Sequence, residues 1–479
     1  MLKLKTIENQ KFSEIKLVEM LFYSFPLWFI VGNLAVSINT LLFIVVSLFL
    51  IKKKQLTFRF NNLNWLLIIF FSYFFVSTTI HFLSPGVLND RLETFSLENN
   101  PIIKSFALIR FLILVIVIDT LFFNKILNFK KLFFFSLFCT SFVSFDVILQ
   151  YITGFDLFGF NKTYMWSSGP FGEEKIAGSY LKNFSFLSFF YIFETYKNKN
   201  FCKPLLIFII IFHLLATAVA GNRMPFILFL FGCLLIVLLI KNLRFIISLS
   251  LVIFFSIFFI LFKYDKTFWM TYDQFRSDIS ILKIFKNYKD NLVKKDNKKI
   301  ELNENLKNLK PKDTKLQTKT ELDPIILLRH SGYNRVFRTA IEIWKERPLT
   351  GFGLKSLRVK CWDMLNKDNI ERKITKRPQN IVCANHAHNY YLEFLSEAGI
   401  IGTGLLVIFF LILLKDSFYY LKRYNQQINP EVNLLVPIII IFFIEIWPIK
   451  STGSFFTTWN ATFFWLNIGL LITGLSRKT

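Results

Sequence analysis

The chain alternates between long apolar blocks and short polar connections. About twelve blocks approach the length of roughly 20 apolar residues that an α-helix needs to cross the hydrocarbon core of a bilayer. The pattern therefore predicts an all-α polytopic membrane protein with about 12 transmembrane helices. The blocks lie near residues 17–36, 38–51, 63–83, 104–123, 132–152, 176–195, 204–220, 225–240, 245–263, 389–414, 433–449 and 456–474.

One long polar segment interrupts this alternation and divides the chain into three parts. Residues 1–263 form an N-terminal bundle of about nine predicted helices, and residues 389–479 add about three more. Between them, residues 264–388 form a large loop. Its stretch 283–321 is rich in Lys, Asn and Asp, which indicates a solvated insertion. Residues 331–347 have apolar positions at helical spacing among charged ones, which predicts an amphipathic helix on the membrane surface.

Composition and charge place the chain in a membrane and orient it. Hydrophobic residues make up 53% of the sequence and include 61 phenylalanines. The formal charge of +25 would suggest nucleic-acid binding in a soluble protein. Here the basic residues gather in the short connections on one side of the predicted bundle, and this argues against nucleic acid. The positive-inside rule then predicts that both termini are cytoplasmic and that the long loop is periplasmic, in a bacterial inner membrane.

The junction between the long loop and the next apolar block carries the most distinctive residues. Residues 386–404 read HAHNYYLEFLSEAGIIGTG. Asn385 or Asn389 can cap the helix that begins here, and Glu393 and Glu397 occupy its first turns, where the helix dipole favours carboxylates. Charges that only stabilise a helix start are the alternative interpretation. Three glycines predict the close approach of a neighbouring helix: Gly399, Gly402 and Gly404.

Arginines and histidines on the predicted outer face suggest phosphate chemistry. Arginine binds phosphate oxygens bidentately and stays charged, and a neutral histidine accepts a proton near pH 7. Arg223 lies between two helices in the sequence AGNRMP, where the alternative is a side chain that extends to lipid headgroups. Arg335 and Arg338 belong to the predicted surface helix, and His388 follows in the junction.

Two cysteines of the long loop predict a disulfide. Cys361 and Cys383 both precede the histidines in a segment that faces an oxidising compartment under the predicted topology. A bond between them would hold the stretch that leads to His386 and His388. The alternative is two free thiols.

Four segments of the chain resemble the O-antigen ligase and polymerase family. The stretch HNYYLEFLSEAGIIG, residues 388–402, is similar to the histidine signature of that family. NRVFRTAIEIWKERPLTGFG, at 334–353, resembles the stretch that precedes this histidine, and AGNRMP, at 220–225, resembles the Thr/Ser-Arg turn of the family. SGPFGEEKIAGSYL, at 168–181, is similar to a Gly-Phe-Gly segment. Asn222 departs from the residue usual before the arginine.

The resemblance implies transfer of a glycan from an undecaprenyl-pyrophosphate carrier to an acceptor hydroxyl on lipid A-core, without a metal or nucleotide cofactor. His388 would be the general base. Arg223 and Arg335, or Arg338 in place of Arg335, would hold the pyrophosphate. Supporting roles would then fall to the polar residues around the histidine: His386, Asn389, Glu393 and Glu397.

Other functions remain open at this point. A polymerase that joins carrier-linked repeats would use the same features. A secondary transporter would need ionisable residues or broken helices near the bilayer midplane and an internal repeat, and we find no convincing repeat. A metal site would need His386, His388 and Glu393 as three ligands, without further His or Cys spacing in support.

Overall fold

The structure, a computed structural model, describes residues 14–83, 100–279, 332–375, 381–425 and 434–476. Within these ranges it is helical, without a β-strand, which confirms the predicted all-α class. The predicted insertion 283–321 lies outside the described residues. The helices are α2 (Phe25–Val31), α3 (Asn33–Lys53), α4 (Asn62–Leu83), α6 (Pro101–Ala107), α7 (Ile109–Phe123), α8 (Phe129–Thr153), α9 (Ala177–Tyr196), α10 (Cys202–Val219), α11 (Arg223–Leu239), α12 (Arg244–Tyr264), α13 (Lys266–Ile279), α15 (Gly332–Glu346), α16 (Ser356–Thr375), α17 (Tyr390–Tyr424), α18 (Val436–Glu445) and α19 (Thr458–Ser476).

Seven spans in the described ranges are long and apolar enough to cross a membrane. They are α3, α4, α6 with α7, α8, α10, α12 with the short turn before it, and α17. The apolar helices α11 and α18 are shorter, and α18 ends at Glu445, before the predicted limit of its block. The first predicted block is divided, because Gly32 takes a φ of 124° between α2 and α3.

Helices from both ends of the sequence form one core. The Trp459 indole of α19 donates a hydrogen bond to the Phe29 carbonyl of α2, and the rings of Phe29, Trp459 and Phe463 pack together. Arg110 of α7 donates to Thr458 at the start of α19. The apolar blocks before and after the long loop therefore share a single hydrophobic interior.

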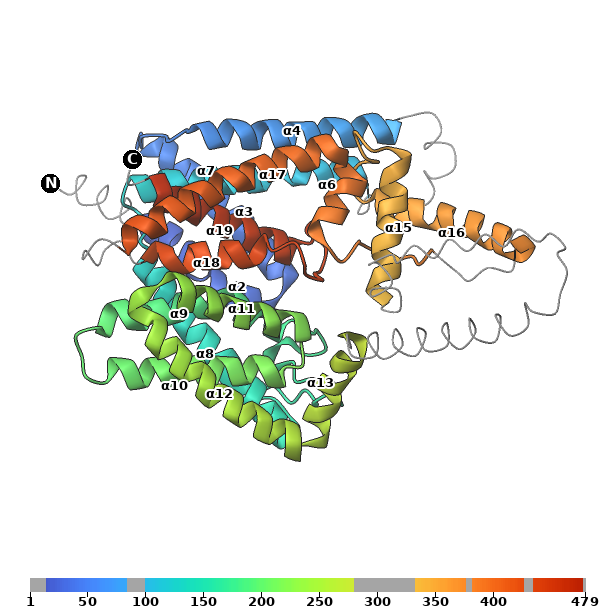
Figure 1. The fold of residues 1–479 in the computed structure, drawn as a ribbon. Coiled ribbons are helices and arrows are strands. Elements are labelled where there is room, and N and C mark those ends of the chain that lie inside the picture. Colours follow the sequence, from blue (N-terminus) through green and yellow to red (C-terminus); the bar gives the residue numbers. More distant parts are fainter. Residues whose placement is uncertain (1–13, 84–99, 280–331, 376–380, 426–433, 477–479) are drawn as a thin grey trace, which may run out of the picture.

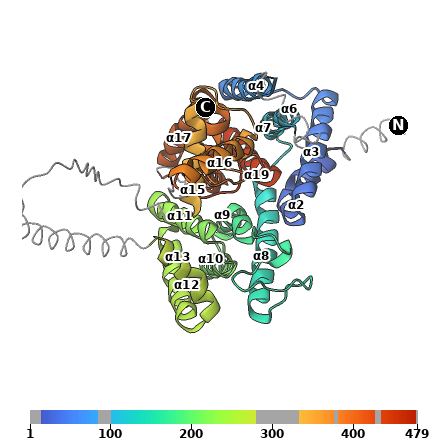
Figure 2. The ribbon, with the colours of Figure 1, turned by 90° about the vertical axis from the view of Figure 1, so that its right-hand side faces the viewer.

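The elements of the long loop gather at one end of the bundle. In Figure 1, α13, α15 and α16 lie at the end opposite the chain's C-terminus. The other end holds the connection before α4, where Arg59 donates to the carbonyl of Ser476 at the end of α19. Figure 2 looks onto the end that carries α15 and α16. The predicted amphipathic helix is confirmed as α15, whose buried side includes Val336, Ala340 and Ile343. Its position on a membrane surface stays a prediction.

A turn of the long loop inserts into a break in α17. Gly399 has non-helical angles (φ 63°, ψ −168°), and the amides of Ile400 and Ile401 donate to the carbonyls of Pro348 and Leu349 at 2.8 and 3.1 Å. In the other direction, the Phe352 and Gly353 amides donate to Ser396 and Glu397 carbonyls at 3.1 and 2.8 Å. Four main-chain hydrogen bonds thus replace those that the break removes.

Glycine permits this insertion. A Cβ on Gly351 would lie 2.5 Å from the Glu397 backbone, and one on Gly399 would lie 2.3 Å from the Leu349 carbonyl oxygen. The close neighbour at Gly399 is therefore a turn and not the helix that the sequence predicted. Gly402 does face α4 through Tyr73, whereas no atom outside its own helix lies within 4 Å of a Cβ on Gly404.

A second, small core holds the segment that leads to the histidines. Cys361 of α16 and Cys383 form a disulfide with a Cα–Cα distance of 5.4 Å. Around it, Ala340 and Ile343 of α15 pack with Ala387. A bond that closes a loop of this length stabilises a fold by about 3 kcal/mol in the chain-entropy account.

Candidate active site

His388 lies at the last turn before α17, in a backbone conformation that few side chains adopt. Its φ is 54°, in the left-handed region that costs a residue with a Cβ about 1 kcal/mol or more. The next residue, Asn389, is the N-cap of α17 and accepts from the amides of Tyr391 and Leu392 at 3.0 and 3.2 Å. The abrupt change from extended loop to capped helix positions the imidazole.

The connection between α18 and α19 holds His388 from the other side. The Thr452 amide donates to the His388 carbonyl at 2.8 Å, and His388 Nδ1 lies 3.3 Å from the Thr452 carbonyl oxygen. A carbonyl only accepts, so Nδ1 carries the proton and Nε2 is the basic nitrogen of the neutral ring. This tautomer is the one that a general base needs if it acts through Nε2.

The two histidines of the junction lie against each other. Their ring centroids are 4.0 Å apart. Burial lowers the pKa of His388, while the Thr452 carbonyl partly opposes that shift. Burial and then the neighbouring His388 charge lower the pKa of His386 to about 4. Both rings are therefore neutral at pH 7, and His386 Nε2 is buried without a hydrogen-bond partner.

Two cations that were not selected from the sequence act electrostatically on His386. Lys355 and Arg358, around the start of α16, both lower the pKa of His386. Glu397 accepts a hydrogen bond from the Lys355 amide and interacts with both positive charges. Glu397 therefore lies in the field of these two cations, which favours its charged form beside the start of α16.

Glu393 is hydrogen-bonded to the connection between α18 and α19. Its carboxylate oxygens accept from the Ser454 hydroxyl at 2.5 Å and from the Phe455 amide at 2.8 Å. Asn389 Nδ2 donates to the carbonyls of Pro448 and Lys450 at 2.8 and 3.2 Å. In the described part of the chain, no three His, Cys, Asp or Glu side chains form a group suited to a metal ion.

Three buried charges lie behind this connection. Glu445 at the end of α18 forms ion pairs with Lys182 of α9 and, at 3.2 Å, with Lys450. The Lys450 ammonium also lies 4.6 Å from the centroid of the Tyr390 ring, at the start of α17. Burial lowers the pKa of Lys450 to about 8, which the Glu445 charge partly offsets. The three groups join α9, α18 and the start of α17.

Arg335 and Arg338 lie in the first half of α15. Arg335 is exposed and Arg338 is partly buried. The C-terminal end of α15 leads to the turn that inserts into α17, while both views bring its N-terminal end toward α13. Thr339 lies one helical turn after Arg335, and its hydroxyl accepts from the Val382 amide at 3.2 Å. Val382 precedes His388 by six residues.

Arg223 begins α11 and lies beside the segment that resembles the family's Gly-Phe-Gly stretch. Its neighbour Asn222 accepts from the Gly178 amide at 3.2 Å and donates to the Lys175 carbonyl at 2.8 Å. Burial raises the pKa of Tyr272 in α13, and the positive charge of Arg223 partly offsets this effect. The motifs at 168–181 and 220–225 are therefore joined directly, on the α13 side of α15.

Several residues belong to the site only through contacts in the folded chain, and the sequence does not single them out. Lys355 and Arg358 look like ordinary charges of a polar segment, and the α18–α19 connection reads as the end of an apolar block. One signal was present: KSTGS, at 450–454, is a compact polar run between two apolar blocks on the predicted outer face.

A model of the O-antigen ligase family matches residues 206–407. This range includes Arg223, α15 and the His388 junction, and it ends before the α18–α19 connection. No curated protein matches the chain. The resemblance that the sequence motifs predicted is confirmed for this part of the chain: residues 206–407, which include apolar helices long enough to span a membrane, match the O-antigen ligase family.

Proposed function

We propose that the protein transfers a glycan from undecaprenyl pyrophosphate to a hydroxyl of lipid A-core at the periplasmic face of a bacterial inner membrane. The observation that carries this proposal is the tautomer of His388, whose Nδ1–H donates to the Thr452 carbonyl and whose Nε2 is basic. The family match supports a ligase or polymerase type of chemistry. The division of the chain at residues 263 and 388 and the cytoplasmic termini belong to the same proposal.

The reaction uses these groups in one displacement. His388 Nε2 removes the proton of the acceptor hydroxyl as its oxygen attacks the anomeric carbon of the donor sugar. The bond from that carbon to the pyrophosphate oxygen breaks, and the carrier leaves as undecaprenyl pyrophosphate. Arginine side chains stabilise the charge that develops on this leaving group. The arginines proposed for this step are Arg223 and either Arg335 or Arg338.

Lys355 and Arg358 extend this proposal beyond the predicted arginines. Their charges act on His386 and on Glu397, whose Oε2 atom is buried without a hydrogen-bond partner. Arg358 Nε is likewise buried without a partner. Unpaired polar atoms at a buried site are costly, so they favour a polar ligand that completes them. The sugar and phosphate oxygens of the donor have this chemistry.

A reconstituted reaction tests the proposal. The purified chain in liposomes receives a carrier-linked glycan and lipid A-core, and the joined product is resolved on a gel. We expect His388→Ala to lower the rate at least 100-fold, the lower range of a general-base contribution. Lys345→Ala, an exposed change on α15, is the control for insertion and folding. A His388→Ala protein that inserts and still forms product would refute the assignment.

A strain that lacks the chain separates ligase from polymerase. Loss of all long chains from lipid A-core, with accumulation of carrier-linked polymer, identifies a ligase. A core that carries a single repeat identifies a polymerase and contradicts the acceptor proposed here.

A further inference from the structure

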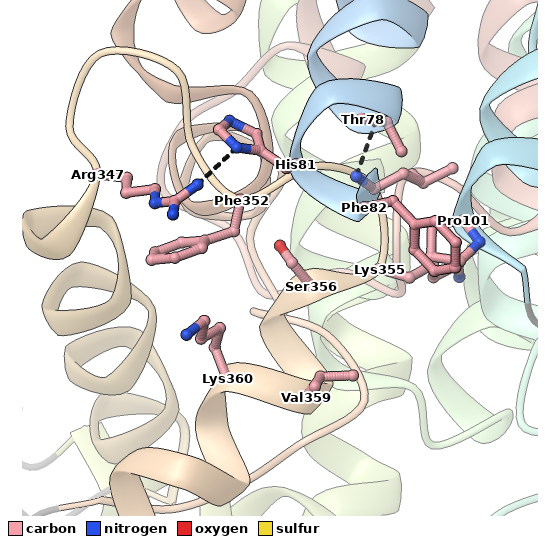
Figure 3. A pocket seen from close by; sticks show the side chains of 11 residues that line it. Thr78, His81, Phe82, Pro101, Arg347, Phe352, Lys355, Ser356, Val359 and Lys360 are labelled. Atoms are coloured by element: carbon pink, nitrogen blue, oxygen red, sulfur yellow. Dashed lines mark hydrogen bonds between the residues drawn. The ribbon is translucent and has the colours of Figure 1, made fainter. Parts of the chain in front are cut away.

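A positively charged pocket opens where α4, α6 and α16 meet the turn that follows α15. Its cavity volume is about 50 Å³. Arg347, Lys355 and Lys360 bring positive charge to its wall, while Phe82 and Pro101 contribute apolar surface (Figure 3). Its lining residues include no Asp or Glu.

Two of these cations share one aromatic ring. The Arg347 guanidinium and the Lys360 ammonium lie 5.0 and 4.8 Å from the centroid of the Phe352 ring. Lys360 also forms an ion pair at 3.9 Å with Asp363, a residue outside the lining. The Phe352 ring lies between the two cations in Figure 3, and each positive charge favours an anion bound in the pocket beside it.

A histidine holds Arg347 without neutralising it. Arg347 Nη1 lies 2.6 Å from His81 Nδ1, and His81 Nε2 lies 3.2 Å from the Thr350 hydroxyl (Figure 3 shows the first contact). Arginine only donates, so Nδ1 accepts and the neutral His81 ring carries its proton on Nε2. The guanidinium is therefore fixed in place, and its full charge faces the pocket.

The wall formed by α16 adds a hydroxyl that lacks a partner. Ser356 Oγ is buried, lines the pocket and makes no hydrogen bond. Buried hydroxyls are normally satisfied. Ser356 is also the first residue of α16, where the helix dipole favours an anion. Several cations, a donor hydroxyl and a helix N-terminus suit a group with several charged oxygens, such as a phosphate.

The position of the pocket indicates a phosphate that is attached to a lipid. Both α4 and α6 with α7 are candidate membrane spans, and the pocket lies where α4 ends and α6 begins. A lipid bound here would place its apolar part against the ends of these spans and its phosphate beside the cations. Arg335 and Arg338, which are proposed to hold the donor pyrophosphate, are not among the lining residues, and we assign the pocket to a second phosphate.

We infer that the pocket binds a phosphate group of the lipid-linked acceptor, a phosphorylated glycolipid of the lipid A type. This inference rests on the proposed function for the identity of the acceptor. Lys355 links the pocket to the reaction centre, since its side chain lines the pocket and its charge acts on His386.

Equilibrium binding without donor tests the pocket independently of catalysis. The full chain in nanodiscs is titrated with a phosphorylated lipid A-type glycolipid and with its dephosphorylated form. We expect the wild type to bind the phosphorylated form at least about 10-fold more tightly, as charged hydrogen bonds predict. The double variant Arg347→Gln/Lys360→Gln loses this preference. Lys345→Gln, which removes an exposed charge of α15 paired with Glu342, retains it.

Other outcomes overturn the inference. Equal binding of the two glycolipids by the wild type means that no phosphate is recognised. Weaker binding of a carrier-linked donor by the double variant, with glycolipid binding unchanged, assigns the pocket to the donor. His388→Ala separates this inference from the proposed function, because it abolishes transfer and leaves the phosphate preference intact. A wild type that shows the preference but transfers no glycan refutes the enzyme and not the pocket.

Discussion

At the scale of single residues, the charge state of His388 is set by its surroundings. The Thr452 carbonyl selects the Nδ1–H tautomer, and burial lowers the pKa below the ordinary value of about 6.5. The positive charge is disfavoured because burial removes water from the ring. The neutral form, which is the base, therefore dominates at pH 7.

This predicts the position of the acid limb of the pH profile. The neutral fraction falls as the pH drops through the lowered pKa, so the transfer rate should decline only below about pH 6.5 and stay level above it. The measurement is kcat from pH 4.5 to 8 in the reconstituted reaction. An acid limb centred above pH 7 would contradict a buried, neutral His388 as the base.

The buried charges around Glu445 make a second prediction at this scale. Glu445→Gln leaves Lys182 and Lys450 without a carboxylate, and breaking a buried ion pair typically costs about 3–5 kcal/mol. We expect a clear fall in the thermal unfolding midpoint in detergent. The matched control Glu342→Gln removes an exposed partner of Lys345 and should change stability by less than about 0.5 kcal/mol. Equal midpoints for the two variants would disprove a structural role of the buried charges.

At the scale of elements, the break in α17 couples the long loop to the membrane bundle. The turn at 348–353 is bonded to residues 396–401, and α4 supports it from the other side, because the Leu354 amide donates to the Thr78 hydroxyl at 3.1 Å. The Tyr73 hydroxyl donates to the Ala398 carbonyl at 3.0 Å, next to the break. The turn that precedes Lys355 is therefore held by two membrane helices.

Two glycines of α17 provide a matched test of this coupling. Gly399→Ala places a Cβ against the Leu349 carbonyl at a positive φ, so it should displace the inserted turn. Hydrogen exchange of the Phe352, Ile400 and Ile401 amides should become faster. Gly404→Ala meets open space in a helix and should leave exchange unchanged, with a stability gain of up to about 1 kcal/mol. Unchanged exchange in Gly399→Ala would show that the turn does not depend on the break.

At the scale of the whole molecule, the topology places the chemistry at one end of the bundle. The elements of the long loop gather there, and the basic connection near Arg59 lies with the end of α19 at the other. The positive-inside rule assigns the second end to the cytoplasm. In the proposed orientation, the candidate active site and the proposed acceptor pocket both face the periplasm.

Labelling of single cysteines tests this orientation. In a background without Cys139, Cys202 and Cys233, Lys345→Cys on α15 should react with an impermeant maleimide in intact cells or spheroplasts. Lys422→Cys, near the end of α17, should react only after permeabilisation. The reverse pattern would invert the topology and move the site to the cytoplasmic face.

The sequence by itself determined the class of fold, the amphipathic helix, a cap at Asn385 or Asn389, of which Asn389 is the cap, and the family resemblance. These features depend on local periodicity, on side chains beside their own backbone and on a signature within one short stretch. The shorter α18 escaped prediction, because apolar residues continue past Glu445 while the backbone turns away toward His388.

Only the tertiary structure decided what surrounds the histidines. Thr452 selects the tautomer of His388 although it lies 64 residues away, and Lys355 and Arg358 reach the histidine pair only because a turn enters a broken helix. The sites of Arg223 and of the α15 arginines likewise depend on how α11 and α15 cross the end of the bundle. Electrostatic and hydrogen-bond partners are set by distance in space, and a pattern along the chain records only distance in sequence.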